Sequence, residues 1–185
     1  MNNQILEDYR VAYNIDTVID LLSMKGAEVI DLFPSDTNYI NNSNIDVLVE
    51  PNKLCDMRTL IIYDSTHSVS DNLKNFFRQE LNILKLIPNL QRAIYTFVSP
   101  RSVVPKHADD DDPYFRMIYG VLTPSNDFKD VGLVIENHEI HLGIKDVIGV
   151  KSDVVHWGWN NTDNYWSVLV LCIEDKKLDE LRKIY

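Results

Sequence analysis

Residues 93–109 read AIYTFVSPRSVVPKHAD, and both the expected architecture and the expected chemistry start from this stretch. The runs 93–98 and 102–107 are rich in β-branched and aromatic residues, and the turn signal Ser99-Pro100 separates them. The second run ends in His107-Ala108-Asp109. Because side chains alternate along a strand, His107 and Asp109 are predicted to lie on the same face.

Six further short runs of the same β-rich character follow at close spacing. They span residues 114–122, 131–136, 138–142, 145–150, 153–157 and 166–173. Turn-forming residues, among them the acidic segment 109–113, separate these runs. Eight short strands at this spacing predict a sandwich or a barrel, so we expect a mainly β fold with flanking helices.

The first 92 residues carry a mixed pattern with few strands. Apolar spacing and end signals predict a helix over 15–25 ended by Gly26, a strand over 28–33, a loop over 35–46, a strand over 60–63 and a helix from Ser70 to Pro88. Residues 175–185 alternate charged residues with Leu and predict a surface helix. We therefore expect a single domain over 1–185, with an α/β part (1–92) that supports a β core (93–174) and a C-terminal helix (175–185).

Composition limits the classes of partner. The 185 residues include 18 basic and 28 acidic ones, a net charge of −10, without the basic face that nucleic acid or an anionic membrane would need. Cys55 and Cys172 lie in apolar surroundings without metal-ligand spacing, which indicates buried thiols in a reducing compartment. No signal-peptide pattern and no membrane-length apolar run occur, so a cytoplasmic location is expected. The pattern does not predict an oligomeric state.

A third candidate ligand comes from a later strand. His156 lies near the end of a predicted strand, and with His107 and Asp109 it forms a candidate 2-His-1-carboxylate site, which leaves one side of an Fe(II) ion open. The alternative is that His107 and Asp109 belong to a surface turn. His138 and His141 are three residues apart, face opposite sides of a strand and are expected to be ordinary strand residues.

Residues 96–173, about 80 of the 185, resemble the aspartyl/asparaginyl β-hydroxylase family, which includes proline 3-hydroxylase. The matched positions are Thr96, Pro100, His107, Asp109, Arg116, Pro124, Gly143, His156, Trp159 and Asn160. The resemblance implies an iron(II)- and 2-oxoglutarate-dependent dioxygenase on a double-stranded β-helix, a cupin-like jelly roll. It also implies hydroxylation, with O2, of an amino acid or of an aspartyl, asparaginyl or prolyl-type side chain in a small-molecule or peptide substrate.

The resemblance further implies a role for each matched site residue. His107, Asp109 and His156 resemble the iron ligands, and Thr96 resembles the hydroxyl residue that contacts the far carboxylate of 2-oxoglutarate. Arg116 resembles a catalytic-site arginine that lies between co-substrate and substrate and holds a carboxylate. The alternative for Arg116 is a surface arginine paired with the aspartates that follow His107.

One position departs from the family pattern. Ten residues after the second histidine the family has an arginine that pairs with the 5-carboxylate of 2-oxoglutarate, and this chain has Trp166 there. Burying a carboxylate without a cation is costly. Either Arg116 or Arg101 reaches that carboxylate, or the pocket takes a different co-substrate. Trp166 is expected to line the co-substrate pocket, or to be an ordinary core residue.

Two alternatives to the oxygenase stay open because of Trp166. One is a cupin-type metalloenzyme that does not use 2-oxoglutarate. The other is a binding module that keeps its metal ligands and has lost catalysis.

Overall fold

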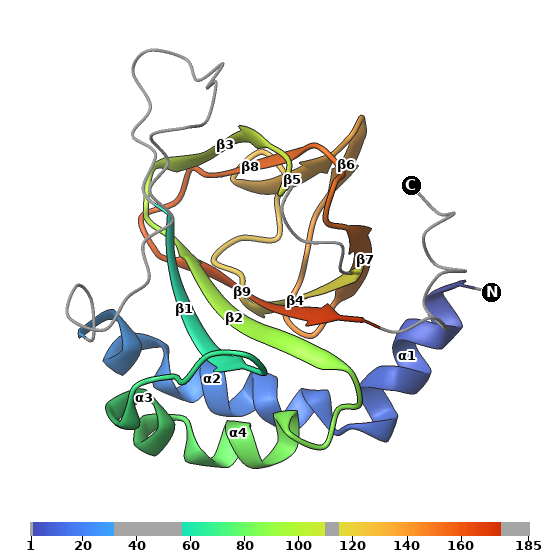
Figure 1. The fold of residues 1–185 in the computed structure, drawn as a ribbon. Helices are drawn as coiled ribbons and strands as arrows, with labels where there is room; N and C mark the ends of the chain where they lie inside the picture. The colour runs from blue at the N-terminus through green and yellow to red at the C-terminus, as the bar shows by residue number, and fades with distance from the viewer. Residues whose placement is uncertain (1, 32–56, 110–114, 175–185) are drawn as a thin grey trace.

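The computed structural model describes residues 2–31, 57–109 and 115–174, which form two facing sheets with helices beneath the larger one (Figure 1). The elements are α1 (Asn2–Ala12), α2 (Ile15–Asp31), β1 (Met57–Asp64), α3 (Asp71–Phe76), α4 (Arg78–Leu84), β2 (Leu90–Val98), β3 (Ser102–His107), β4 (Phe115–Leu122), β5 (Val131–Ile135), β6 (His138–Ile140), β7 (Val147–Lys151), β8 (His156–Asn160) and β9 (Trp166–Ile173).

The chain passes several times between two sheets. The larger sheet has the order β1-β2-β9-β4-β7 and the smaller has the order β3-β8-β5-β6, with antiparallel neighbours throughout. The turn at Ser99-Pro100 carries the chain from β2 in the larger sheet to β3 in the smaller one. Two antiparallel sheets between which the chain passes in this way confirm the predicted mainly β fold with flanking helices.

The larger sheet separates two hydrophobic cores. On β9, Leu169 and Leu171 belong to the core between this sheet and the helices, whereas Trp166 and Val168 belong to the core between the two sheets. This alternation follows from the two-residue repeat of a strand. The core between the sheets is where the candidate site lies.

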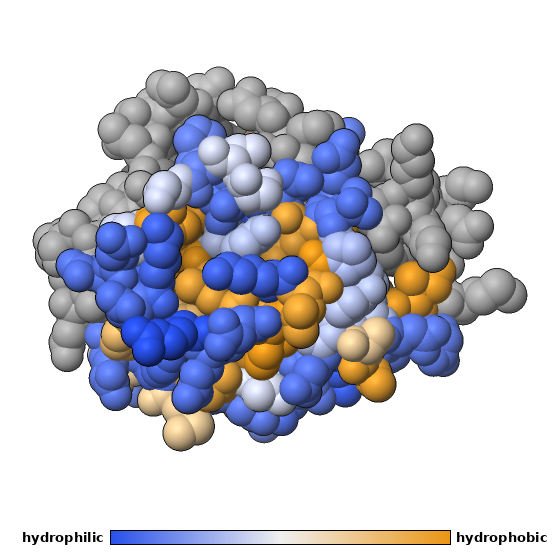
Figure 2. All heavy atoms as spheres, turned by 60° about the horizontal axis from the view of Figure 1, so that its bottom comes forward, coloured by the Kyte–Doolittle hydropathy of each residue, from blue (hydrophilic) through white to orange (hydrophobic). Residues whose placement is uncertain are grey.

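Helices α2 and α4 pack together beneath the larger sheet. An ion pair joins them, since Lys25 Nζ lies 2.7 Å from Oε1 of Glu80, whose side chain is fully buried. Figure 2 shows the molecule turned so that the helical side comes forward, with hydrophobic side chains gathered at its centre and hydrophilic ones around them. None of the described helices is long and apolar enough to cross a membrane.

The N-terminal elements differ from the sequence prediction in two places. Gly26 does not end the helix, because α2 continues to Asp31, so Glu28–Asp31 is helical and not part of a strand. A Cβ on Gly26 would lie 2.8 Å from Cδ1 of Leu122, so this glycine allows the helix to approach the sheet. Helix α1 was not predicted, since its apolar positions are sparse. The predicted loop over 35–46, the predicted helix over 175–185 and Cys55 lie outside the described residues.

Other expectations agree with the structure in part, and the single helix expected from Ser70 to Pro88 is two helices, α3 and α4, with Phe77 between them. Ser70 caps α3, its hydroxyl accepting a hydrogen bond from the Leu73 N–H at 3.3 Å. Cys172 is buried, as expected. The strand expected over 153–157 begins later, at His156, because residues 152–154 form a turn. The division of the chain into supporting part, core and terminal helix stays a prediction.

Asp64 fixes the end of β1. Its carboxylate accepts hydrogen bonds from the hydroxyl and N–H of Thr66, from the N–H of His67 and from Nε of Arg92 on β2. Partial burial raises the pKa of Asp64, but these hydrogen bonds outweigh burial and lower the pKa to about 2. The ionised carboxylate therefore stabilises the β1–β2 edge of the sheet.

Candidate metal centre

Three candidate ligands meet at one end of the space between the sheets. His107 ends β3, Asp109 follows it by two residues, and His156 begins β8 directly opposite His107 in the strand register. The two imidazole rings have centroids 4.2 Å apart. Ligand atoms of His107, Asp109 and His156 all lie within 4.8 Å of one another, and among the described residues this is the group of three that could hold a metal ion.

Backbone carbonyls fix both histidine rings. Nδ1 of His107 lies 2.7 Å from the Pro105 carbonyl oxygen, and Nδ1 of His156 lies 3.0 Å from the Val154 carbonyl oxygen. A carbonyl oxygen only accepts, so each Nδ1 must carry a proton, which in the neutral ring leaves the lone pair on Nε2. Histidines that bind metals through Nε2 are held by this kind of outer hydrogen bond.

Both Nε2 atoms face the carboxylate of Asp109. The Nε2 atom of His107 is 3.8 Å from Oδ1, and that of His156 is 3.6 Å from Oδ2. The Asp109 N–H donates to the Ser152 carbonyl oxygen at 3.0 Å, which anchors the backbone of the aspartate beside β7. Two imidazole nitrogens and a carboxylate on one side of a small space match the donor set of a facial Fe(II) site.

Arg116 lies next to this group. Its Nη1 donates to Oδ2 of Asp109, and its side chain is 13% exposed. Arg116 is thus an inward-facing residue of β4 and not a surface arginine, although it does pair with an aspartate as the alternative interpretation expected. A guanidinium in this position orients the carboxylate.

The His156 ring is electrically neutral in this setting. Burial lowers the pKa of His156, and the neighbouring His107 lowers it further, whereas the Val154 carbonyl and Asp109 act in the opposite direction. The neutral imidazole is the form that binds a metal ion.

A cavity of about 110 Å³ opens from the candidate ligands into the space between the sheets. Its walls are largely aliphatic side chains from both sheets, among them Ile94, Val104, Ile118, Leu133 and Val168. Thr96 and Trp166, the two predicted co-substrate residues besides Arg116, both line it. Arg101 does not, since its side chain is 64% exposed and pairs with Asp163 at 2.9 Å. Arg101 therefore cannot replace the missing arginine.

Two polar residues that line the cavity were not identified from the sequence. Thr59 of β1 lies opposite Thr96 in the register, and both are buried. Lys151 borders the cavity at the end of β7, next to Ser152. Neither position has a local signal, because both enter the cavity through strand pairing across long sequence separations.

Most of the aromatic residues near the ligands in sequence do not face the cavity. Phe115 and Tyr119 belong to the core against the helices. Trp157 and Trp159 stack on each other with ring centroids 5.1 Å apart, and Trp159 packs edge-on against Phe128. They form a cluster apart from the cavity, so among the described lining residues Trp166 is the one with a Phe, Tyr or Trp side chain.

Asn160 has a structural role. Its side-chain nitrogen is within 3.2 Å of the carbonyl oxygens of Val98, Ser99 and Asn164. Its amide oxygen accepts from the N–H and the hydroxyl of Thr162. The matched Asn160 thus joins the ends of β2 and β8 to the turn before β9, and does not touch the candidate ligands.

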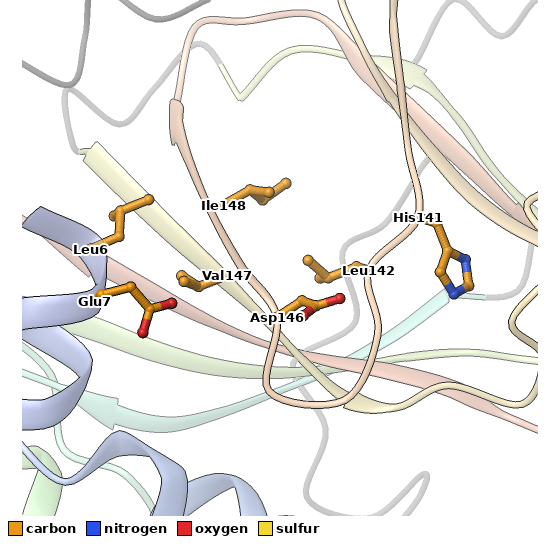
Figure 3. Close-up of a pocket in the computed structure, with 7 residues that line it drawn as sticks. All are labelled: Leu6, Glu7, His141, Leu142, Asp146, Val147 and Ile148. Atoms are coloured by element: carbon orange, nitrogen blue, oxygen red, sulfur yellow. The ribbon is translucent and has the colours of Figure 1, made fainter. Parts of the chain in front are cut away.

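A second cavity, of about 260 Å³, lies between α1 and the segment from β6 to β7 (Figure 3). Its lining residues are Leu6, Glu7, His141, Leu142, Asp146, Val147 and Ile148. Nδ1 of His141 lies 3.2 Å from the Val131 carbonyl oxygen, and Asp146 accepts from the Gly143 N–H at 2.8 Å. In Figure 3 His141 and Glu7 lie at opposite ends of the cavity, so the titratable side chains do not converge on one point.

Comparisons with known proteins give the fold but no family. No family model and no curated protein matches the sequence. Among solved structures, a prolyl-4-hydroxylase from Pseudomonas putida is similar, with a TM-score of 0.53, 12% identity and coverage of 85% of this chain and 88% of that chain.

Two further solved structures are less similar. The cupin domain of Schizosaccharomyces pombe Cnp3 has a TM-score of 0.43 and 7% identity, over 70% of this chain and 72% of that chain. A predicted oxalate decarboxylase from Thermotoga maritima has a TM-score of 0.40 and 13% identity, over 63% and 79%. The predicted jelly roll rests on the two facing antiparallel sheets of this chain, and the specific resemblance to the aspartyl/asparaginyl β-hydroxylases has no family match behind it.

Proposed function

We propose that this protein is a non-haem Fe(II) oxygenase in which His107, Asp109 and His156 hold the metal and a 2-oxo acid, 2-oxoglutarate in the enzymes it resembles, is the co-substrate. The observation that carries the proposal is the fixed orientation of both imidazoles. Two rings with Nδ1 bound to backbone carbonyls and Nε2 directed at one carboxylate are prepared for a metal ion before it arrives.

The donor set also fits the metal. Two neutral nitrogens and one carboxylate oxygen on one side suit Fe(II) and leave positions for a chelating co-acid and O2. When bound, iron and the co-acid would supply the oxidation: one atom of O2 enters the substrate as a hydroxyl group, and the other enters the co-acid, which loses CO2 and becomes the acid one carbon shorter.

The protein residues would orient and shield this reaction. Arg116 binds Oδ2 of Asp109 and so fixes the carboxylate in place. The aliphatic wall of the cavity keeps water away from the open side of the ligand group. Arg116 is the cation nearest the ligands on β4, and a carboxylate of substrate or co-substrate would approach it.

The substrate class follows from the resemblance and from the size of the cavity. We propose an amino acid, or an aspartyl, asparaginyl or prolyl-type side chain presented by a small molecule or a peptide. A cavity of about 110 Å³ suits one small group that reaches the metal from outside, and not a bulky molecule buried whole.

A second candidate function is favoured by Trp166. The protein would then be a cupin-type metalloenzyme, or a metal-retaining binding module, that uses no 2-oxo acid. Its support is the replacement of the expected arginine by an uncharged side chain in the cavity wall.

The test begins with metal-free protein under anaerobic conditions. Fe(II) is added to one equivalent, and a 2-oxo acid is then titrated while visible absorption is recorded. We expect one Fe(II) per chain and a weak charge-transfer band that needs both components. The His107→Ala variant should give neither, whereas His138→Ala, which alters an exposed histidine on β6, should behave as the unaltered protein.

The outcomes separate the candidates. Iron that binds without a band for any 2-oxo acid would reject the oxygenase in favour of the second candidate. Equal iron binding by His107→Ala and the unaltered protein would reject the metal centre itself.

A further inference from the structure

The charged side chains around the cavity gather at its metal end. Among the described residues that line it, those with titratable groups are His107, Asp109, Arg116, Lys151 and His156. The carboxylate of Asp109 lies close to side-chain nitrogens of His107, Arg116 and His156. Lys151 precedes Ser152, whose carbonyl oxygen accepts from the Asp109 N–H. A ligand that extends from the metal toward the rest of the cavity therefore extends away from these charged side chains.

Trp166 occupies the region where a charged partner would be expected. Its side chain is 3% exposed and rises from the start of β9, opposite Val98 of β2. Its ring reaches the smaller sheet, because a Cβ on Gly158 would lie 3.4 Å from Cζ3 of the indole. Gly158 is two residues beyond the candidate ligand His156 on β8. The indole thus spans the space between the sheets close to the metal end.

The indole also has an unused hydrogen-bond donor. Nε1 of Trp166 is buried and has no hydrogen-bond partner among the residues that the structure describes. Buried donors are nearly always paired in native proteins, so an unpaired one in a cavity wall calls for an acceptor from a ligand. A neutral N–H pairs well with a carbonyl or ether oxygen, but it does not neutralise a carboxylate.

Away from the charged groups at the metal end, the other polar groups of the wall are also neutral. Thr59 and Thr96 lie opposite each other on β1 and β2, with 4% and 7% of their surface exposed. Two hydroxyls and an indole N–H, set among aliphatic side chains, can solvate an uncharged polar atom. They cannot offset the cost of removing a second carboxylate from water, because none of them carries a positive charge.

Resting on the proposed function, we propose that the co-substrate is a 2-oxo acid with a single carboxylate, whose far end is uncharged and accepts a hydrogen bond from the indole of Trp166. The carboxylate and oxo group at the near end serve the metal. The apolar chain and its neutral oxygen lie against the aliphatic wall. Trp166 is then the residue that selects against 2-oxoglutarate.

The experiment compares two ligands that differ in one charge. Anaerobic Fe(II)-loaded protein is titrated with 2-oxoglutarate and with its 5-methyl ester, and the charge-transfer band gives a dissociation constant for each. We expect the ester to bind at least about tenfold more tightly. In Trp166→Phe, which keeps an aromatic ring and loses the N–H, the ester should lose several-fold in affinity. In Trp166→Arg the preference should reverse toward 2-oxoglutarate.

The comparison in the unaltered protein stands even if a variant fails to fold, which circular dichroism would reveal. Binding of 2-oxoglutarate as tight as that of the ester, or tighter, would overturn this inference and leave the proposed function intact. Iron binding with no band for either ligand would overturn both.

Discussion

Replacing Asp109 by alanine should have two separable effects. The carboxylate stands between the two imidazoles and accepts from Arg116. Its loss should abolish tight Fe(II) binding, because two imidazoles alone make an incomplete site. It should also lower the stability of the metal-free protein, because the guanidinium of Arg116, with a side chain only 13% exposed, loses its nearest carboxylate among the described residues.

The size of the second effect follows from the burial of the pair. Breaking a fully buried ion pair costs about 3–5 kcal/mol, and an exposed pair contributes about 0–1 kcal/mol. The side chains of Asp109 and Arg116 are 22% and 13% exposed, which places them between these limits. Because Arg116 has further contacts, we expect Asp109→Ala to lower the free energy of unfolding by about 2 kcal/mol.

The assay is urea unfolding of metal-free protein at pH 7, with Asp109→Ala, Arg116→Met and the double variant. The double variant should be more stable than Asp109→Ala alone, because it no longer buries the guanidinium of Arg116 without the Asp109 carboxylate. A matched control is Asp163→Ala, which breaks the Arg101 pair; both of its side chains are exposed, at 64% and 81%, so its effect should be near zero. If Asp109→Ala matched the unaltered protein in stability and in Fe(II) affinity, the reasoning about this site would be refuted.

Three further predictions concern stability. Asp64 has a pKa of about 2 in the folded protein against 3.8 when unfolded, so its ionised carboxylate should contribute about 2 kcal/mol to stability above pH 4. This contribution should be lost as the pH falls from 4 to 2. Urea unfolding across that range should show that Asp64→Asn does not have this loss of stability. Gly158→Ala should destabilise by about 1–3 kcal/mol, because its Cβ would lie 2.8 Å from the Gly132 carbonyl oxygen, and a melting temperature equal to that of the unaltered protein would contradict this. Fe(II) at about 100 times its dissociation constant should raise the melting temperature by about 5–10 °C, and no rise is expected in His156→Ala.

The sequence predicts well what depends on local spacing. The strands of the β core are short runs rich in β-branched and aromatic residues between turn signals, and His107 and Asp109 lie at the end of one of them, so their common direction needs no knowledge of the rest of the chain. Ser70 marks the start of α3 by the same kind of local signal. These features depend on neighbours within a few residues.

What the sequence does not predict depends on contacts between distant segments. The exact pairing of His107 with His156 depends on the register of β3 and β8; from the sequence, His156 was a candidate only because it lies near the end of a predicted strand, and the family resemblance added to this. Gly26 was expected to end a helix, because nothing near it in sequence indicates that Leu122 lies against it. The position of the Trp166 indole across the cavity likewise needs β9 beside β2 and opposite β8.

The larger sheet is buried on both of its faces, and this has a consequence for how the protein can change. A slip of one residue between β2 and its neighbours would move Tyr95 and Phe97 from the helical core into the ligand cavity. Both cores therefore penalise the same error, so an insertion or deletion within one of these strands should be strongly destabilising. Ligand preference is therefore most readily changed by single side-chain replacements on fixed strands, such as a replacement of Trp166 in the cavity wall.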